Sequence, residues 1–157
     1  MVMLVHVTAA KLGPKIARSG LIAGAYAFPV LESFTLTHQW TREILKWKRQ
    51  PMIGVYFRIP DEAPVRFGRY GRPMQNAPAC RAVGEIRQEP DARGFQIIVE
   101  RAVKGRDIAR ITPLRGVVGW RHFPDAHGRH PCACPACLAR GEPGGRALRL
   151  RYERGDL

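Results

Sequence analysis

The chain has 157 residues, 45% of them hydrophobic, which is enough for one folded domain with a small appendage. No apolar run approaches the ~20 residues of a membrane-spanning helix and no secretion signal opens the chain, so we expect a soluble cytoplasmic protein. The 26 Lys and Arg against 13 Asp and Glu give a net charge of +13, which favours nucleic acid as a partner. A phosphate-bearing cofactor or an acidic lipid face would match the same charge.

The first 30 residues predict a strand–helix–strand unit. Met1–Val7 is a short apolar strand, and His6 and Thr8 share one face because side chains alternate along a strand. Thr8 is a suitable N-cap for the helix that follows. A second strand over Ala25–Val30 carries Tyr26. The unit therefore presents polar and aromatic side chains that could form a site.

Residues 31–48 predict one long amphipathic helix. An apolar stripe with spacings of four, four and three residues runs along it, formed by Leu36, Trp40, Ile44 and Trp47. We expect the two tryptophans and His38 to belong to the core and its rim rather than to a base-stacking platform.

Strands dominate the rest of the chain, so the predicted fold class is α+β with helices near the N-terminus. The expected elements are the strands Ile53–Ile59, Val65–Tyr70, Gly94–Glu100 and Gly116–Trp120, and a short helix over Ala77–Arg87. Arg66, Arg69 and Arg72 alternate with Phe67 and Tyr70. This interleaving suits a nucleic-acid or substrate loop, and it suits a solvated edge strand equally well.

The last part of the chain holds a cluster of candidate metal ligands, namely Cys132, Cys134, Cys137 and His130. Tetrahedral zinc takes four Cys or His ligands, so we predict a small structural zinc loop, with His127 or Cys80 as other choices for the fourth ligand. Reduced surface thiols are one alternative, and a redox pair of Cys134 and Cys137 is another, although the strand–helix setting of such a pair is not found. A change in composition divides the chain into a domain over 1–122 and a basic, Cys/His-rich extension over 123–157.

Several motifs occur in a characteristic order: His6 on a first strand, a helix ending in Ser19-Gly20-Leu21, Tyr26 on a second strand followed at once by a helix, a late strand near residue 95, and Ile108-Ala109-Arg110-Ile111. This order resembles the ADP-ribosyltransferase superfamily. The nearest branch is that of the DNA-modifying DarT-type toxins, which open with a similar His-x-Thr, helix and Gly-Leu. The resemblance covers about residues 4–112.

The resemblance implies a split, mixed β-sheet and a site that consumes NAD as a substrate. His6 would hold the adenosine ribose, the ring of Tyr26 would stack on the cationic nicotinamide, and Thr8 and Phe28 would help to line the pocket. Arginines would neutralise the pyrophosphate. A Glu on the late strand would stabilise the oxocarbenium-like centre that forms as nicotinamide leaves. A toxin of this kind also implies an antitoxin partner.

At that acidic position this chain has Gln96. A Gln retains the shape and can hydrogen-bond, but it lacks the charge, and losing one such group typically costs about 10²–10³ in rate. Three interpretations follow: Gln96 is an inactivating substitution, Glu100 on the same strand face is the catalytic acid instead, or the chain is a binding protein on a retired enzyme fold.

The sequence thus predicts an NAD-dependent ADP-ribosyltransferase that modifies a nucleic acid, with Gln96 or Glu100 and Tyr26 at the catalytic centre. The first alternative is a non-enzymatic, zinc-stabilised nucleic-acid-binding protein. A second is an NAD-using RNA 2′-phosphotransferase, although the paired Arg and His motifs of that branch are not found. A third is an enzyme that modifies protein.

Overall fold

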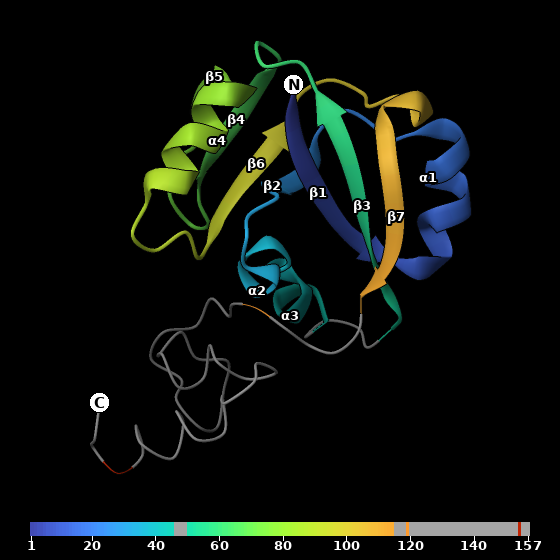
Figure 1. The fold of residues 1–157 in the computed structure, drawn as a ribbon, viewed down its shortest axis with the longest axis horizontal. Helices are drawn as coiled ribbons and strands as arrows, with labels where there is room; N and C mark the ends of the chain where they lie inside the picture. The colour runs from blue at the N-terminus through green and yellow to red at the C-terminus, as the bar shows by residue number, and fades with distance from the viewer. Residues whose placement is uncertain (46–49, 115–118, 120–153, 155–157) are drawn as a thin grey trace.

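The computed structural model describes residues 1–45, 50–114, 119 and 154 (Figure 1). Its strands are β1 (Val2–Ala9), β2 (Ala25–Pro29), β3 (Met52–Ile59), β4 (Pro64–Arg69), β5 (Gln75–Pro78), β6 (Phe95–Val99) and β7 (Ile108–Leu114). Its helices are η1 (Ala10–Leu12), α1 (Gly13–Ser19), α2 (Phe34–Thr37), α3 (Trp40–Leu45), α4 (Ala79–Gln88) and η2 (Gly105–Asp107). The predicted α+β class is confirmed for this part of the chain.

The strands form one seven-stranded sheet in the order β5-β4-β6-β2-β1-β3-β7, and every pairing in it is antiparallel. The prediction of a mixed sheet was therefore wrong. Helix α1 brings the chain back beside the end of β1, so β2 runs antiparallel to its neighbour. Strands β5 and β7 were not predicted. Along β7 the partly buried residues Ile108, Ile111 and Leu114 are separated by pairs of exposed residues, so the two-residue alternation that marks a strand is absent.

The sheet is narrowest between β1 and β2. Their ladder contains two residue pairs, Leu4 with Pro29 and Val5 with Phe28, whereas the β1–β3 ladder contains eight. Figure 1 shows β1, β3 and β7 with α1 on one side of this junction, and β2, β6, β4 and β5 with α4 on the other. The two strands separate beyond the short ladder, and this leaves room for a cleft.

The predicted long helix over 31–48 is wrong, because α2 ends at Thr37 and α3 begins at Trp40. The residues at the break, His38 and Gln39, are buried and hydrogen-bonded to distant parts of the fold. Those tertiary bonds compensate for the loss of helical continuity. His38 is 2% exposed, as expected for a core residue. The final stripe residue, Trp47, lies outside the described residues.

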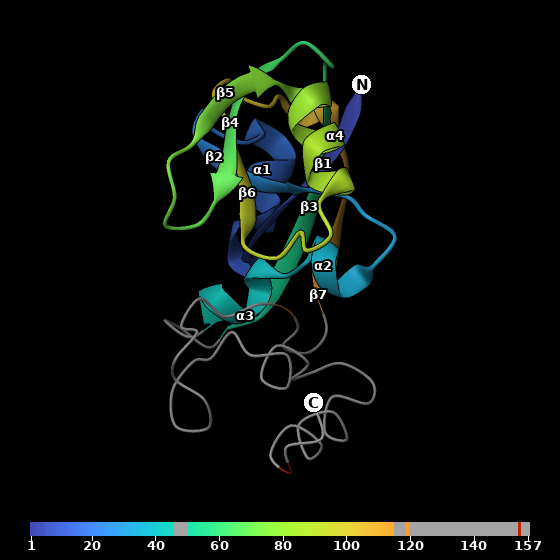
Figure 2. The same ribbon diagram turned by 90° about the vertical axis from the view of Figure 1, so that its left-hand side faces the viewer.

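Helices α2 and α3 lie together at one end of the sheet, as both Figure 1 and Figure 2 show. The apolar core lies above them, between the sheet and helices α1 and α4, and it includes Leu4, Phe28, Phe57, Ile86 and Ile97. None of the described helices is long and apolar enough to cross a membrane.

The predicted strand at 65–70 is confirmed as β4, but β4 is flanked by β5 and β6, so the alternative of an edge strand is wrong. Arg69 donates to the carbonyl oxygens of Asp91 and Arg93 at 2.7 and 2.9 Å and is held in place by them. Arg66 pairs with Glu100 at 3.2 Å. These two arginines therefore have structural partners. The predicted strand at 116–120 and the extension over 123–157 lie almost entirely outside the described residues.

Candidate functional site

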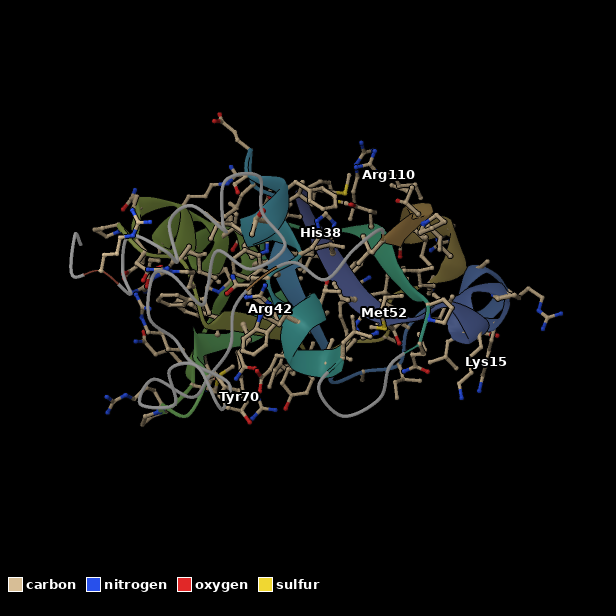
Figure 3. All side chains as sticks on the ribbon, turned by 90° about the horizontal axis from the view of Figure 1, so that it is seen from below. Lys15, His38, Arg42, Met52, Tyr70 and Arg110 are labelled. Atoms are coloured by element: carbon tan, nitrogen blue, oxygen red, sulfur yellow. The ribbon has the colours of Figure 1, made fainter. Side chains whose placement is uncertain are left out.

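A cleft of about 520 Å³ opens where β1 and β2 separate. Side chains from β1, β2 and β6 line one part of it, and residues from α2 and α3 together with Tyr70 line the rest. Figure 3 views the molecule from this end, with α3 in front of the strands. The volume is typical of pockets that bind small molecules. Three residues predicted from sequence, His6, Tyr26 and Gln96, all line this one cleft.

His6 bridges the two separating strands. Its Nδ1 lies 2.7 Å from the backbone oxygen of Tyr26. A carbonyl oxygen only accepts, so Nδ1 carries the proton and Nε2 of the neutral ring is left as an acceptor. Burial lowers the pKa of His6, and the hydrogen bond to Tyr26 opposes this effect only in part. The ring is therefore neutral near pH 7 and can accept a hydrogen bond from a ligand hydroxyl.

The two aromatic residues of β2 differ strongly in exposure. Tyr26 is 57% exposed and offers its ring to solvent at the cleft, whereas Phe28 is 1% exposed and belongs to the core. Burial of Phe28 follows from its place opposite Val5 in the short β1–β2 ladder. Tyr26 can therefore stack on a ligand, while Phe28 forms part of the apolar wall behind it.

Gln96 comes from β6, where it lies opposite Gly68 of β4. Its amide nitrogen lies 3.7 Å from the sulfur of Met74, which is a weak acceptor. Its carbonyl oxygen receives no hydrogen bond from the described residues, so this oxygen is available to a ligand hydroxyl in the cleft.

Two predicted site residues do not line the cleft. Thr8 pairs with Ile53 further along β1. Glu100 lies about 13 Å beyond Gln96 at roughly 3.3 Å per residue, and its carboxylate pairs with Arg66 instead. Glu100 is therefore not brought to this cleft among the described residues, and its predicted role as the catalytic acid stays a prediction. A shared strand face was not enough to bring it to the site.

The sequence analysis missed the acid that does line the cleft, which is Glu43 on α3. Its side chain is 7% exposed. A signal was present, because Glu43 is the only acidic residue between Ser33 and Pro60 and lies next to Ile44 of the apolar stripe. Trp40 and Tyr70 also line the cleft, with ring centroids 5.6 Å apart.

Hydrogen bonds fasten the start of α3 to the start of β6. Gln39 donates to the oxygen of Ala92 at 3.1 Å and accepts from the Gly94 amide at 2.6 Å. The indole nitrogen of Trp40 donates to the oxygen of Phe95 at 2.9 Å. Because these bonds connect 39–40 to 92–95, they fix the helix that carries Glu43 relative to the strand that carries Gln96.

A second buried network holds α2 against β3. His38 donates from Nδ1 to the oxygen of Phe34 at 2.8 Å, so its Nε2 accepts from the Tyr56 hydroxyl at 2.6 Å. Burial lowers the pKa of His38, and the nearby charge of Arg110 lowers it further against the opposing bond to Phe34. This network is a structural support for the wall of the cleft.

The predicted zinc ligands Cys132, Cys134, Cys137 and His130 lie outside the described residues, so the zinc loop stays a prediction. Within the described ranges no three His, Cys, Asp or Glu residues are grouped to hold a metal. No protein-family model matches the chain, and no curated protein or solved structure matches it either. A functional conclusion must therefore come from the chemistry of the cleft.

Proposed function

We propose that this protein is an NAD-dependent ADP-ribosyltransferase that transfers ADP-ribose to a nucleic acid. One observation carries the proposal: His6, Tyr26 and Gln96 come from three different strands and line one cleft of small-molecule size. These are the residue types that the motif order in the sequence associates with an NAD site. The cleft supports a ligand that combines a flat ring with ribose hydroxyls.

The residues of the cleft suit the nicotinamide end of NAD. The exposed ring of Tyr26 offers a face on which a cationic aromatic ring stacks favourably. The Nε2 of neutral His6 and the carbonyl oxygen of Gln96 are acceptors for ribose hydroxyls. Hydrogen bonds from the ribose hydroxyls to these acceptors would fix its reacting carbon relative to an incoming acceptor.

The reaction breaks the bond between C1′ of the ribose and the nicotinamide ring nitrogen. The electron pair of that bond goes to the ring nitrogen and cancels its charge. A lone pair of the acceptor forms the new bond to C1′, and the proton of the acceptor is released to water. The products are free nicotinamide and the ADP-ribosylated acceptor.

The choice of a nucleic acid as acceptor is supported by a surface that we call the basic face, formed by Lys11, Lys15, Arg18, Lys104 and Arg106. All five side chains are exposed and none forms an ion pair in the described part of the chain. Gly105 packs directly on the backbone of Ala17 and Arg18, which brings the cations of α1 and η2 side by side. Lys15 extends away from α1 in Figure 3. Such a surface matches a phosphate backbone.

The proposal is tested by incubating the full chain with NAD labelled on its adenosine part and with separate pools of DNA, RNA and protein. We expect nicotinamide release and label on one nucleic-acid pool. A Gln96→Glu variant adds a charge beside the reacting ribose, so we expect faster release, by up to about 10²–10³-fold. A Tyr26→Ala variant should bind NAD weakly and release little nicotinamide.

A Glu85→Gln variant is the matched control, because Glu85 pairs with Arg81 on α4 and does not line the cleft. It should behave like the unchanged chain. Failure of the unchanged chain and of Gln96→Glu both to bind NAD and to release nicotinamide would contradict the proposal. Salt-sensitive binding of DNA or RNA in that case would favour the non-enzymatic nucleic-acid-binding protein.

A further inference from the structure

The loop between β4 and β5, residues 70–74, begins and ends at the cleft. Tyr70 is one of the residues that line it. At the other end of the loop, the sulfur of Met74 lies 3.7 Å from the amide nitrogen of Gln96, which also lines the cleft. Arg72 stands two residues from each end, so its Cα lies within about 7 Å of both Tyr70 and Met74. The loop therefore carries Arg72 at the rim of the cleft.

Hydrogen bonds fix the first half of this loop. The amide of Tyr70 donates to the oxygen of Gly94 at 2.8 Å, and the amide of Arg72 donates to the oxygen of Arg69 at 3.0 Å. The backbone of Arg72 is therefore part of a closed turn.

Packing fixes the second half. The loop folds back over Gly68, where a Cβ would lie 3.1 Å from the oxygen of Pro73 and 3.4 Å from the sulfur of Met74. Gly71 has a φ of +75°, which allows the reversal, and Pro73 restricts the residue before it to extended conformations. Arg72 is thus presented from a supported turn.

The three arginines that alternate with aromatic residues in this segment differ in their partners. Arg66 pairs with Glu100 at 3.2 Å. The guanidinium of Arg69 bonds to Glu89 at 3.2 Å and to two backbone oxygens. Arg72 is exposed, and its guanidinium forms no ion pair or hydrogen bond with the described residues. Of the three, Arg72 is the one whose charge is open to a ligand.

A guanidinium at the rim of a cleft of this size matches the phosphate of a nucleotide. It is permanently charged, and its fork of N–H groups binds two phosphate oxygens at once. The exposed ring of Tyr26 offers a stacking surface inside the cleft. A nucleotide whose ring enters the cleft would therefore bring a phosphate, one ribose away, to the rim.

We propose that Arg72 binds a phosphate group at the mouth of the cleft while a nucleotide occupies it. This proposal rests on the proposed function and adds a binding residue to it. The phosphate has two sources, NAD itself or the backbone of the nucleic acid that approaches as acceptor. The basic face is a separate surface, since Lys15 and Tyr70 lie on opposite sides of the view in Figure 3.

The first measurement compares nicotinamide mononucleotide with nicotinamide riboside, which has the same ring and ribose but no phosphate. Calorimetry gives the affinity of the full chain for each. If the phosphate comes from NAD, the unchanged chain should prefer the mononucleotide by about tenfold or more, because a hydrogen-bonded charge pair is involved. An Arg72→Gln variant should lose most of this preference and bind the riboside as before.

The second measurement follows the binding of labelled DNA and RNA oligonucleotides by fluorescence anisotropy. If the phosphate comes from the acceptor, Arg72→Gln should weaken this binding by about tenfold and leave the comparison of the two nicotinamide probes unchanged. Arg72→Lys keeps the charge without the fork and should retain part of the affected binding. Arg81→Gln, which removes another exposed arginine on α4, should change neither measurement appreciably.

This proposal and the proposed function fail in different ways. If the unchanged chain binds NAD, but Arg72→Gln changes both measurements no more than Arg81→Gln does, the role of Arg72 is overturned and the NAD site stands. If the unchanged chain binds neither NAD nor the nicotinamide probes nor the oligonucleotides, the proposed function is overturned and the role of Arg72 falls with it. Thermal unfolding of each variant shows that lost binding is not a lost fold.

Discussion

The cleft and the basic face differ in how the same chain distributes its charge. The basic face gathers five exposed cations on η1, α1, η2 and the residue before it, with Asp107 as the acid nearest in sequence. The lining of the cleft contains one carboxylate and neither Lys nor Arg among the described residues. The net charge of +13 of the whole chain therefore does not predict the charge of the described residues that line the cleft. Exposed cations form the basic face, whereas aromatic rings and uncharged polar groups make up most of the polar and aromatic part of the described cleft lining.

The largest expected effect comes from Gly20, which supports the basic face. Its φ of +78° is unfavourable for other residues, and a Cβ there would lie 1.9 Å from the oxygen of Val103. We expect Gly20→Ala to destabilise the fold by about 3 kcal/mol in denaturant unfolding. Gly24→Ala is the control, since Gly24 also has a positive φ but has open space around it, and should cost about 1 kcal/mol. Equal costs would contradict this explanation.

The next effect concerns the cations themselves. A triple variant, Lys11→Glu with Lys15→Glu and Arg18→Glu, reverses the charge of the η1–α1 part of the basic face. We expect nucleic-acid affinity to fall by about 10²-fold or more, with a shallower dependence on salt, because fewer phosphates are neutralised. Fluorescence anisotropy with labelled DNA and RNA at several salt concentrations measures both quantities.

Two comparisons make that experiment specific. Arg81→Glu on α4 removes an equally exposed cation far along the chain and should change the affinity little. Release of nicotinamide from NAD in the cleft should be unchanged in the triple variant when no nucleic acid is present. Loss of both ligands together would mean that the cleft and the basic face are not independent.

A smaller effect is expected beneath the cleft, at the buried bond between Tyr56 and His38. Tyr56→Phe removes the hydroxyl and leaves Nε2 of His38 without its donor. We expect a loss of about 1–2 kcal/mol in the free energy of unfolding. Tyr26→Phe removes a hydroxyl from an exposed ring and should leave the stability nearly unchanged, so a similar loss in both variants would argue against the network.

The sequence predicted the local elements well and the long-range contacts poorly. Strands around His6, Tyr26 and Gln96 follow from apolar runs between turn residues, and they are correct within a few positions. The break between α2 and α3 was not predictable from periodicity, because it depends on bonds from Gln39 to residues 55 positions away. Strand β7 was hidden because its partner β3 lies more than 50 residues earlier in the chain, as the pair Phe57 and Ile108 shows.

In the candidate site, too, the contacts between distant parts of the chain were the part that could not be predicted. His6, Tyr26 and Gln96 were found because a motif order named them, and the structure brings them together. Glu43 was read as part of a continuous helix, and its burial depends on how α3 packs against β6. Glu100 was one of three interpretations because alternation placed it on the same strand face as Gln96, but alternation carries no information on position along the strand or on pairing with Arg66.

The smallest effect concerns pH. Protonation of His6 at low pH should give the cleft a positive charge, as the basic face already has. Burial holds the pKa of His6 and of His38 below 6.5, so between the folded pKa and 6.5 the unfolded chain binds more protons than the folded chain. Stability is therefore complete above about pH 6.5 and declines as the pH falls through this window, by at most about 1.4 kcal/mol per pH unit for each histidine. In a His6→Gln variant the melting temperature should depend less steeply on pH between 7 and 5. Of these two histidines, only His38 then contributes to the pH dependence of stability. An equal slope in both proteins would mean that His6 is as easily protonated in the folded cleft as in water.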